Sequence, residues 1–479
     1  MFFNEDLNKY IQFKFVENEK KLEKIKGFNF KEEYFLIKNA LDQYLDNQLE
    51  NRFIALHGLR GVGKTTILYQ LYNYLLNEKK IDSKNVLYVS MDQVNSFFDT
   101  DLYELVYTFI KGTHNKNIAF LDEKIFIFVD EAQYDKKWAI SGKIIFDTTE
   151  NIFLLCTGSS ALEMEINADV ARRLSKQLIF PNNFKDFLLL KYDIKTDYRF
   201  SKALKNLIYF GEKKYLEKSI KLEEKVLGNL YLPSNPPEFE FENFLKSKGI
   251  PSTLNLDESE SYEKIYTQID AIINKDIPTV KSFNTSTSET IRKIIFYLGL
   301  QKPGGTSINK IANHLSVSPN VVSGILDVLE KTQILFSVKP YGGGGKIVRK
   351  PWQYFFLSPS IKAAINFNVG RFNLNNRKCL GALAETLVAN GLYKMIKLDF
   401  PFMGLFYPPD KNSSDFIIRT KLDDMVPIEV GVGKKTKKQL KNDINKYDCE
   451  FGVLVSNRYN SIRKEEEIIH IPLMTFGFI

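Results

Sequence analysis

The segment Gly58-Leu-Arg-Gly-Val-Gly-Lys-Thr65 constrains the fold of this chain more than any other feature of the sequence. The residues before it, 52 to 57, have an apolar centre and predict a short buried strand, and residues 66 to 76 have helical periodicity. Glycines in such a loop let backbone N–H groups wrap phosphates without obstruction by side chains. The N-terminus of the following helix adds its dipole to the same anion site. Strand, glycine-rich loop and helix together predict an α/β domain with a phosphate-binding loop.

The motif assigns roles to individual residues of the loop. Lys64 is expected to reach the β- and γ-phosphates of ATP, and the Thr65 hydroxyl to bind Mg²⁺. The flanking strand and helix disfavour the alternative, an incidental glycine turn. We therefore expect ATP and Mg²⁺ as ligands, with the nucleotide held by Gly58, Leu59, Arg60, Gly61, Val62, Gly63, Lys64, Thr65 and Thr66.

A second apolar run, residues 124 to 129, ends in Asp130-Glu131. Acids at the carboxyl end of a buried strand lie where α/β sheets bind their ligands. Asp130 is expected to hold Mg²⁺ through water, and Glu131 to act as base or orienter for the attacking water. The alternative is that both acids cap the next helix.

The third run, residues 151 to 156, leads to two polar residues, Thr157 and Ser159, that are candidates for sensing the γ-phosphate. A serine-capped helix start is the competing interpretation. Arg172 and Arg173 follow, and in a ring of subunits one of them would reach a neighbour's γ-phosphate as an arginine finger. A surface salt bridge is the competing interpretation for these arginines.

These residues resemble the prokaryotic AAA-type ATPases whose C-terminal region has a restriction-endonuclease-like fold. The segments that carry the resemblance are Val129-Asp-Glu-Ala-Gln133, Cys156-Thr-Gly-Ser-Ser-Ala-Leu162, Ala171-Arg-Arg-Leu174 and Phe180-Pro-Asn-Asn-Phe-Lys-Asp-Phe-Leu188. The resemblance implies an ATPase core with the N-terminal segment (1–194), a helical lid packed on the core (195–278), a winged helix (279–353) and a nuclease-like α/β domain (354–479). A second sensing arginine is often found in the lid of this family, yet no arginine lies between Arg199 and Arg292.

Residues 307 to 315 and 319 to 330 read as two short helices across a turn, which predicts a helix-turn-helix. Residues 334 to 338 and the glycines 342 to 345 would form a wing. The exposed face of the second helix carries no arginine, so reading of bases looks poor, whereas three basic residues after the wing would hold phosphates. The exposed residues of the second helix are Asn320, Ser323 and Asp327, and the basic residues after the wing are Lys346, Arg349 and Lys350. Such a module also serves for protein packing, which is the alternative here.

The last region suggests a helix near residues 382 to 390, three short strands, a lysine-rich helix and a final strand, an order that resembles the PD-(D/E)XK nuclease core. On that resemblance Glu385, Asp415 and Glu429 would bind Mg²⁺. The motif needs a lysine two residues after the second acid, and this chain has Gly431 there. Lys434 or Lys435 is the candidate to take the role of the missing lysine. Without that lysine a DNA-binding domain that does not cut is the preferred interpretation. The lysines between residues 434 and 446, six against one aspartate, would contact a DNA backbone or simply form a solvated helix face.

Composition limits the remaining choices. The three cysteines lack paired spacing, no run is long enough to span a bilayer, and the start carries acids where a signal peptide needs basic residues, so we expect a reducing, cytoplasmic location without membrane contact. A net charge of +8 suits an acidic partner without requiring one. The preferred function is an ATPase that binds or remodels DNA by its shape rather than its sequence, as a homo-oligomer such as a hexamer. The alternatives are a nucleotide-controlled protein-interaction switch and an ATP-licensed Mg²⁺-dependent nuclease.

Overall fold

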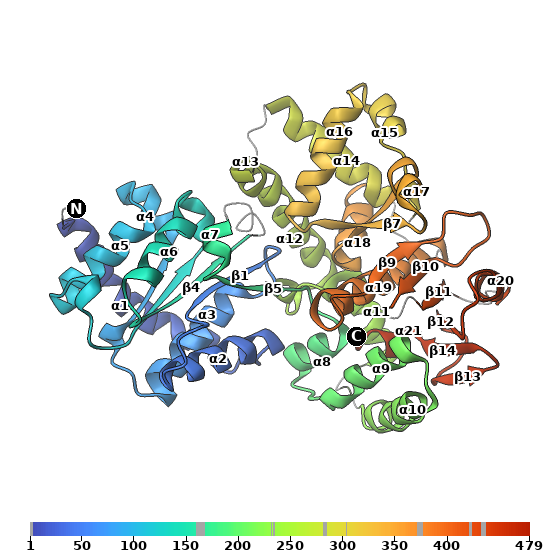
Figure 1. Cartoon of the computed structure of the whole chain (residues 1–479), viewed down its shortest axis with the longest axis horizontal. Coiled ribbons are helices and arrows are strands. Elements are labelled where there is room, and N and C mark those ends of the chain that lie inside the picture. Colours follow the sequence, from blue (N-terminus) through green and yellow to red (C-terminus); the bar gives the residue numbers. More distant parts are fainter. Residues whose placement is uncertain are drawn as a thin grey trace. The chain divides into compact units, whose positions relative to one another are not determined.

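The computed structural model describes residues 3–159, 168–230, 232, 235–280, 285–302, 304–370, 377–420, 424–432 and 437–479. The chain divides into two compact units. The first unit comprises Met1–Phe180 and Asn274–Ser282, and the second comprises Pro181–Ile273 and Phe283–Ile479. Each unit is built around a sheet of its own (Figure 1).

The first unit contains a five-stranded sheet in the order β2-β3-β4-β1-β5, and each neighbouring pair is parallel. The central β1 places His57 opposite Gly158 of β4 on one side and Leu178 of β5 on the other. Because the strands are parallel, their carboxyl ends lie at one edge of the sheet. The strands are β1 (Phe53–Gly58), β2 (Val86–Ser90), β3 (Ile125–Asp130), β4 (Ile152–Gly158) and β5 (Ser175–Ile179).

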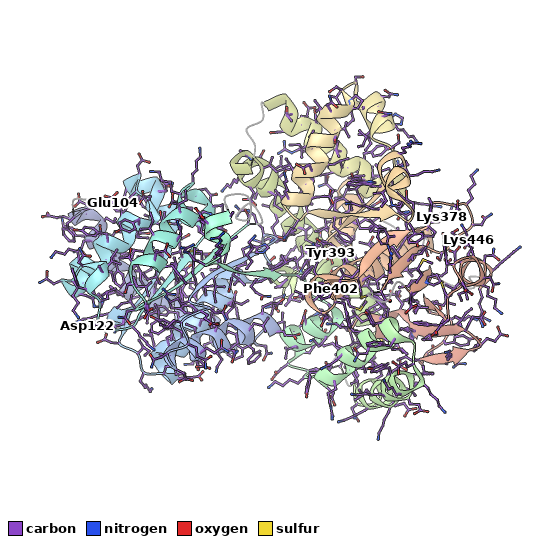
Figure 2. The ribbon with its side chains drawn as sticks, viewed as in Figure 1. Glu104, Asp122, Lys378, Tyr393, Phe402 and Lys446 are labelled. Carbon is purple, nitrogen blue, oxygen red and sulfur yellow. The ribbon has the colours of Figure 1, made fainter. Side chains whose placement is uncertain are left out.

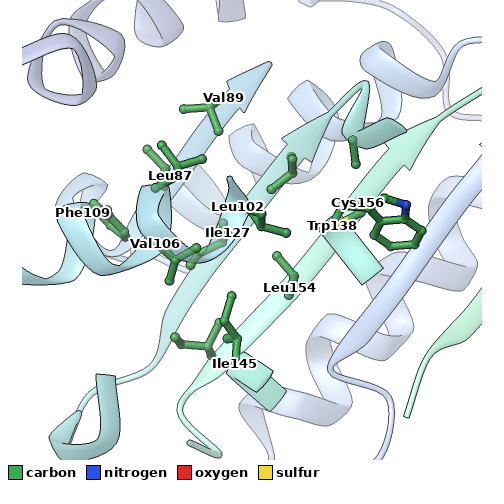
Figure 3. Packing of buried hydrophobic residues seen from close by; sticks show 14 of the residues in the cluster. Leu87, Val89, Leu102, Val106, Phe109, Ile127, Trp138, Ile145, Leu154 and Cys156 are labelled. Atoms are coloured by element: carbon green, nitrogen blue, oxygen red, sulfur yellow. The ribbon is translucent and has the colours of Figure 1, made fainter. Parts of the chain in front are cut away.

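Helices cover both faces of this sheet, which explains why its central strands are continuous apolar runs. On one face, Leu87, Ile127 and Leu154 pack against helices α5 and α6 (Figure 3). On the other face, the ring centroids of Tyr44 and Phe126 lie 5.7 Å apart. The α/β fold expected from the glycine-rich segment is confirmed. The helices of this unit are α1 (Glu5–Ile25), α2 (Glu32–Leu45), α3 (Lys64–Asn73), α4 (Met91–Phe98), α5 (Leu102–Phe109), α6 (Trp138–Thr148), α7 (Ala168–Ala171) and α13 (Ile277–Val280).

The second unit begins with helices α8 (Phe184–Tyr192), α9 (Tyr198–Phe210), α10 (Lys213–Gly228), α11 (Pro237–Asn243) and α12 (Glu258–Ala271). We expected residues 195–278 to form a lid on the nucleotide-binding core. Of these, the residues as far as Ile273 belong to the second unit. The buried carboxylate of Glu223 in α10 shows one reason, since it accepts hydrogen bonds from the Ile462 N–H and the Thr475 hydroxyl. Both partners lie near the C-terminus, so α10 is joined to the C-terminal part of the chain.

The second unit also contains a nine-stranded sheet, in the order β13-β14-β12-β11-β10-β9-β7-β8-β6. Strands β7 and β8 pair antiparallel, and β7 also pairs in parallel with β9 through Lys339 and Phe406. The predicted wing strand and the C-terminal strands therefore share one sheet. The strands are β6 (Gly305–Thr306), β7 (Leu335–Pro340), β8 (Trp352–Phe356), β9 (Gly404–Tyr407), β10 (Phe416–Arg419), β11 (Met425–Gly431), β12 (Gly452–Ser456), β13 (Arg463–Glu465) and β14 (Ile468–Pro472).

One local expectation for this region needs correction. We expected a plain glycine tip at residues 342 to 345, but Gly344–Arg349 forms helix α17, and the indole N–H of Trp352 donates to the carbonyl oxygen of Ile347 at 3.0 Å. The remaining helices are α14 (Thr285–Leu300), α15 (Ile308–Leu315), α16 (Pro319–Lys331), α18 (Pro359–Asn368), α19 (Arg377–Leu398), α20 (Lys438–Lys446) and α21 (Leu473–Phe476). The division into four domains stays a prediction.

Within the described residues, no helix has the length and apolar character needed to cross a membrane. Asp122 in the first unit and Lys446 in the second, both labelled in Figure 2, are examples of exposed charged side chains.

Candidate nucleotide-binding site

The loop between β1 and α3 takes a conformation that favours glycine at three of its positions: Gly58, Gly61, where φ is 82°, and Gly63. A Cβ atom on Gly58 would lie 2.5 Å from the carbonyl oxygen of Ile179, closer than any side chain tolerates. Gly63 has a φ of 102°, in the left-handed region that favours glycine. Helix α3 begins directly afterwards, at Lys64. The loop is therefore arranged as the motif predicts, at the carboxyl edge of the sheet.

Lys64 is buried, with 6% of its surface exposed. Its ammonium group donates hydrogen bonds to the carbonyl oxygens of Gly58 at 2.9 Å and Leu59 at 3.0 Å, so the side chain folds back over the loop. Burial lowers the pKa of Lys64, and the carboxylates of Glu131 and Asp130 oppose that shift. A cation held in a glycine loop at a helix N-terminus suits the phosphate chain of a nucleotide.

Asp130 ends β3 and is the acceptor for three hydroxyl groups. The Thr65 hydroxyl donates to its Oδ2 at 2.7 Å, and the Tyr88 hydroxyl donates to the same oxygen at 3.1 Å. The Thr157 hydroxyl donates to Oδ1. Burial and the neighbouring Glu131 raise the pKa of Asp130, and the hydroxyls of Thr157 and Thr65 oppose that shift. The Thr65 hydroxyl and the Asp130 carboxylate are hard oxygen ligands beside the loop, and so they fit a Mg²⁺ ion.

Glu131 follows with a φ of 53°, an unusual backbone conformation for a residue other than glycine. Such strain persists only where the surroundings enforce it, and it is common at functional sites. The Gln133 amide nitrogen donates to Oε2 of Glu131. The Oε1 of Gln133 accepts from the Ser159 N–H at 3.3 Å. Gln133 thereby ties Glu131 to the end of β4.

Arg60, in the loop itself, contacts two carboxylates. Its Nε donates to Oδ2 of Asp276 at 2.9 Å and its Nη2 to Oδ1 at 2.6 Å. Its Nη1 lies 3.7 Å from Oε1 of Glu131. Asp276 carries no motif that the sequence analysis recognised, and an isolated aspartate far along the chain gives no signal by which to find it.

The two arginine-finger candidates do not join this cluster. Arg173 donates to Asp147 at 2.6 Å and to the carbonyl oxygen of Asp169 at 3.0 Å, so it forms the surface salt bridge that was the competing interpretation. Arg172 is exposed. A finger role concerns an assembly of subunits and stays a prediction.

The predicted metal site in the C-terminal region consists of Glu385, Asp415 and Glu429. Oδ2 of Asp415 accepts the Val430 N–H at 2.7 Å, and Glu429 is fully buried on β11. In the described part of the chain, no group of three or more histidine, cysteine, aspartate or glutamate side chains is placed to hold a metal ion. The expected Mg²⁺ site of Glu385, Asp415 and Glu429 therefore gains no support. Lys434 and Lys435, the proposed substitutes for the missing lysine at Gly431, lie outside the described residues.

Comparison with known proteins agrees with the geometry of the first unit. Residues 50–188 match a protein family described as an AAA domain. That span starts just before β1 and includes the glycine-rich loop, Asp130-Glu131 and Thr157. Over 446 residues the chain is 33% identical to "Uncharacterized protein MJ1637" of Methanocaldococcus jannaschii, covering 93% of this chain and 88% of that protein. The chain belongs to one family with this archaeal protein. It thus has an AAA domain of the P-loop ATPase type, as the loop and the resemblance predicted.

Two further similarities are weaker. "Uncharacterized protein MJ1544" of the same organism is 23% identical over 393 residues, 79% of this chain and 75% of that protein. The solved structure of the Aeropyrum pernix ORC1 protein in complex with DNA is 14% identical, covering 71% of this chain and 93% of that chain, with a TM-score of 0.31. That score is too low to indicate a shared overall arrangement. The AAA domain match ends at residue 188, so the nuclease-like interpretation of the C-terminal region stays a prediction.

Proposed function

We propose that the protein hydrolyses ATP in its AAA domain and that the nucleotide state controls a second unit that binds DNA. The observation that carries the proposal is the meeting of Lys64, Thr65 and the Asp130-Glu131 pair at one edge of the parallel sheet. This edge is where α/β sheets bind their ligands.

Each residue has a distinct chemical task in this proposal. Lys64 and the loop N–H groups neutralise the phosphates, and the Thr65 hydroxyl and Asp130 would hold Mg²⁺, which supplies charge neutralisation at the β- and γ-phosphates. Tyr88 and Thr157 hold the Asp130 carboxylate in place through their hydroxyls. Glu131 orients the attacking water and takes its proton.

Of the two candidates for sensing the γ-phosphate, the contacts favour Ser159. The Thr157 hydroxyl is engaged with Asp130. The Ser159 hydroxyl is buried, with 4% of the residue exposed, and makes no hydrogen bond among the described residues. A buried hydroxyl with unused hydrogen-bonding capacity is costly unless it has a task.

The DNA part of the proposal is supported by a groove in the second unit, beside helix α16. It has a cavity volume of about 630 Å³ and joins the exposed face of α16 to the residues that precede β8. Arg349 and Lys350 line it and are exposed, and the structure shows no ion pair for either among the described residues. Asn320, Ser323 and Asp327 line it as well. Free cations beside a weakly polar helix suit contacts to phosphates better than reading of bases.

The lysine-rich helix α20 supports DNA binding less well than its sequence suggested. Lys437 pairs with Glu465, Lys441 with Glu466, and Lys446 with Asp410. These acids offset the positive charge, so a solvated helix face is the better interpretation of this run.

The finer organisation belongs to the same proposal. We assign α15, α16 and the β7–β8 pair to a winged helix, α9 to α12 to a helical lid that belongs to the second unit, and the C-terminal strands to a nuclease-like fold that does not cut DNA. A homo-oligomer, such as a hexamer with Arg172 as the finger, is proposed because the γ-phosphate would then lie between subunits.

Steady-state ATP hydrolysis tests the proposal, measured alone and with single-stranded, duplex and four-way-junction DNA. Lys64→Ala is the blank, since it removes the cation of the loop. We expect turnover that is lost in Lys64→Ala and stimulated by at least one form of DNA. Turnover that no DNA changes would favour a protein-interaction switch, and turnover that persists in Lys64→Ala would refute the site.

A further inference from the structure

The segment Asn274–Ser282 belongs to the first unit, whereas the residues on either side of it, Ile273 and Phe283, belong to the second. The chain therefore leaves the second unit, contributes one short segment to the nucleotide-binding unit, and returns. The helical turn Ile272–Asp276 and helix α13 carry this passage. Because the chain is continuous, the segment is covalently joined to the second unit at both of its ends.

Asp276 is the residue through which this segment contacts the nucleotide-binding loop. Two nitrogens of the Arg60 guanidinium donate to its two carboxylate oxygens, at 2.9 Å and 2.6 Å. The Asp276 side chain is 2% exposed and that of Arg60 is 20% exposed. A bidentate pair that is shielded from water fixes both the position and the orientation of the guanidinium.

The same guanidinium faces the residue assigned to activate water. Nη1 of Arg60 lies 3.7 Å from Oε1 of Glu131, so two carboxylates compete for one cation. While Asp276 occupies two of the nitrogens, Glu131 interacts with the third only at the edge of ion-pair distance. If Asp276 moves away, Arg60 is free to form a close pair with Glu131. A paired carboxylate is a weaker base and is held away from the attacking water.

We propose that Asp276 is a positioning residue that holds Arg60 away from Glu131, so that displacement of the segment Asn274–Ser282 switches hydrolysis off. The inference rests on the proposed ATPase function and adds a means of regulating it. The segment joins the two units through the continuous chain. A second sensing arginine was expected in the lid, but no arginine lies between Arg199 and Arg292.

The test is a comparison of kcat and KM for ATP in three variants. Asp276→Asn is expected to lower kcat by about tenfold or more, as part of the roughly 10²–10⁴-fold that general-base catalysis contributes, and to leave KM nearly unchanged. Adding Arg60→Gln to Asp276→Asn removes the guanidinium that captures Glu131, so the double variant is expected to be faster than Asp276→Asn alone. Because removal of one partner leaves the other shielded from water and unpaired, thermal unfolding of each variant checks that a lower kcat is not a loss of fold.

Asp270→Asn is the matched control, since it removes another aspartate–arginine pair, with Arg292, only a few residues earlier. It is expected to keep the wild-type kcat. Should Asp276→Asn fail to fold, Asp276→Glu replaces it, because the longer side chain displaces the carboxylate while keeping its charge. An unchanged kcat in Asp276→Asn, or a double variant no faster than the single one, would overturn the inference while wild-type hydrolysis still supports the proposed function. Absence of wild-type hydrolysis would instead reject the proposed function itself.

Discussion

At the scale of single residues, the sequence predicts those residues of the candidate nucleotide-binding site that lie close to the end of a strand, and it does not predict the others. Lys64, Asp130 and Thr157 could be predicted because each follows a recognisable apolar strand. Asp276 could not, because it is 216 residues from Arg60 and only the folded chain brings the two together. Tyr88 was missed for a similar reason, since tyrosine inside a strand normally indicates packing rather than a contact with a carboxylate.

Glu131 carries the sharpest prediction at this scale. Glu131→Gln keeps the size of the side chain but removes its ability to accept a proton. We expect ATP hydrolysis to fall by about a hundredfold or more, while nucleotide binding is retained because Lys64 and the loop are intact. Single-turnover release of phosphate, together with titration of a fluorescent ATP analogue, measures the two quantities separately.

The control for this variant is Glu123→Gln, which changes a carboxylate that pairs with His114 and Lys116 at the protein surface. It should leave both quantities as they are. Hydrolysis within a few-fold of wild type in Glu131→Gln would show that another group activates the water.

At the scale of helices and strands, the apolar runs predicted β1, β3 and β4, and their parallel order follows from the helices between them. The joining of β7 to β9 was not predicted, because pairing between strands distant in sequence leaves no local pattern.

The segment Phe180 to Leu188, quoted above for its family resemblance, proves to be structural. The Phe184 N–H donates to the Gly477 carbonyl oxygen at 2.8 Å, and its ring lies 5.4 Å from that of Phe478.

Strand β14 supplies a prediction about pH. Burial, aided by Lys437, lowers the pKa of His470 to about 4. An unfolded histidine takes up its proton near pH 6.5, so between these values the unfolded state binds more protons than the folded state. The free energy of unfolding of the second unit is therefore expected to fall as the pH drops from about 6.5 to 4, by at most about 1.4 kcal/mol per pH unit from this residue.

Urea denaturation at several pH values, for wild type and His470→Gln, isolates that contribution as a difference. The variant should lose less stability than wild type across this interval. Glu465, whose pKa the Lys437 ammonium helps to lower to about 2, acts in a lower pH range and does not mask the effect. Parallel curves for the two proteins would mean that His470 titrates normally in the folded state.

At the scale of the whole molecule, positive charge in the sequence is a poor guide to where an acidic partner binds. The densest run of lysines lies around α20, yet Lys437 and Lys441 are each paired with a glutamate. Arg349 and Lys350 come from a sparser stretch, but they line the groove beside α16 without such partners among the described residues. A cation already paired must first break its ion pair to contact a phosphate, so the two sets should contribute unequally to DNA binding.

This difference can be measured as a salt dependence. The logarithm of the DNA association constant falls with the logarithm of salt concentration by about 0.9 for each phosphate contact on duplex DNA. Arg349→Ala combined with Lys350→Ala is expected to weaken binding and to reduce that slope by about two contacts' worth. Lys437→Ala combined with Lys441→Ala removes the same amount of charge and serves as the matched control, with a slope expected to stay near that of wild type. If the control pair changed the slope more than the groove pair, DNA would lie on α20, and the groove beside α16 would have another occupant.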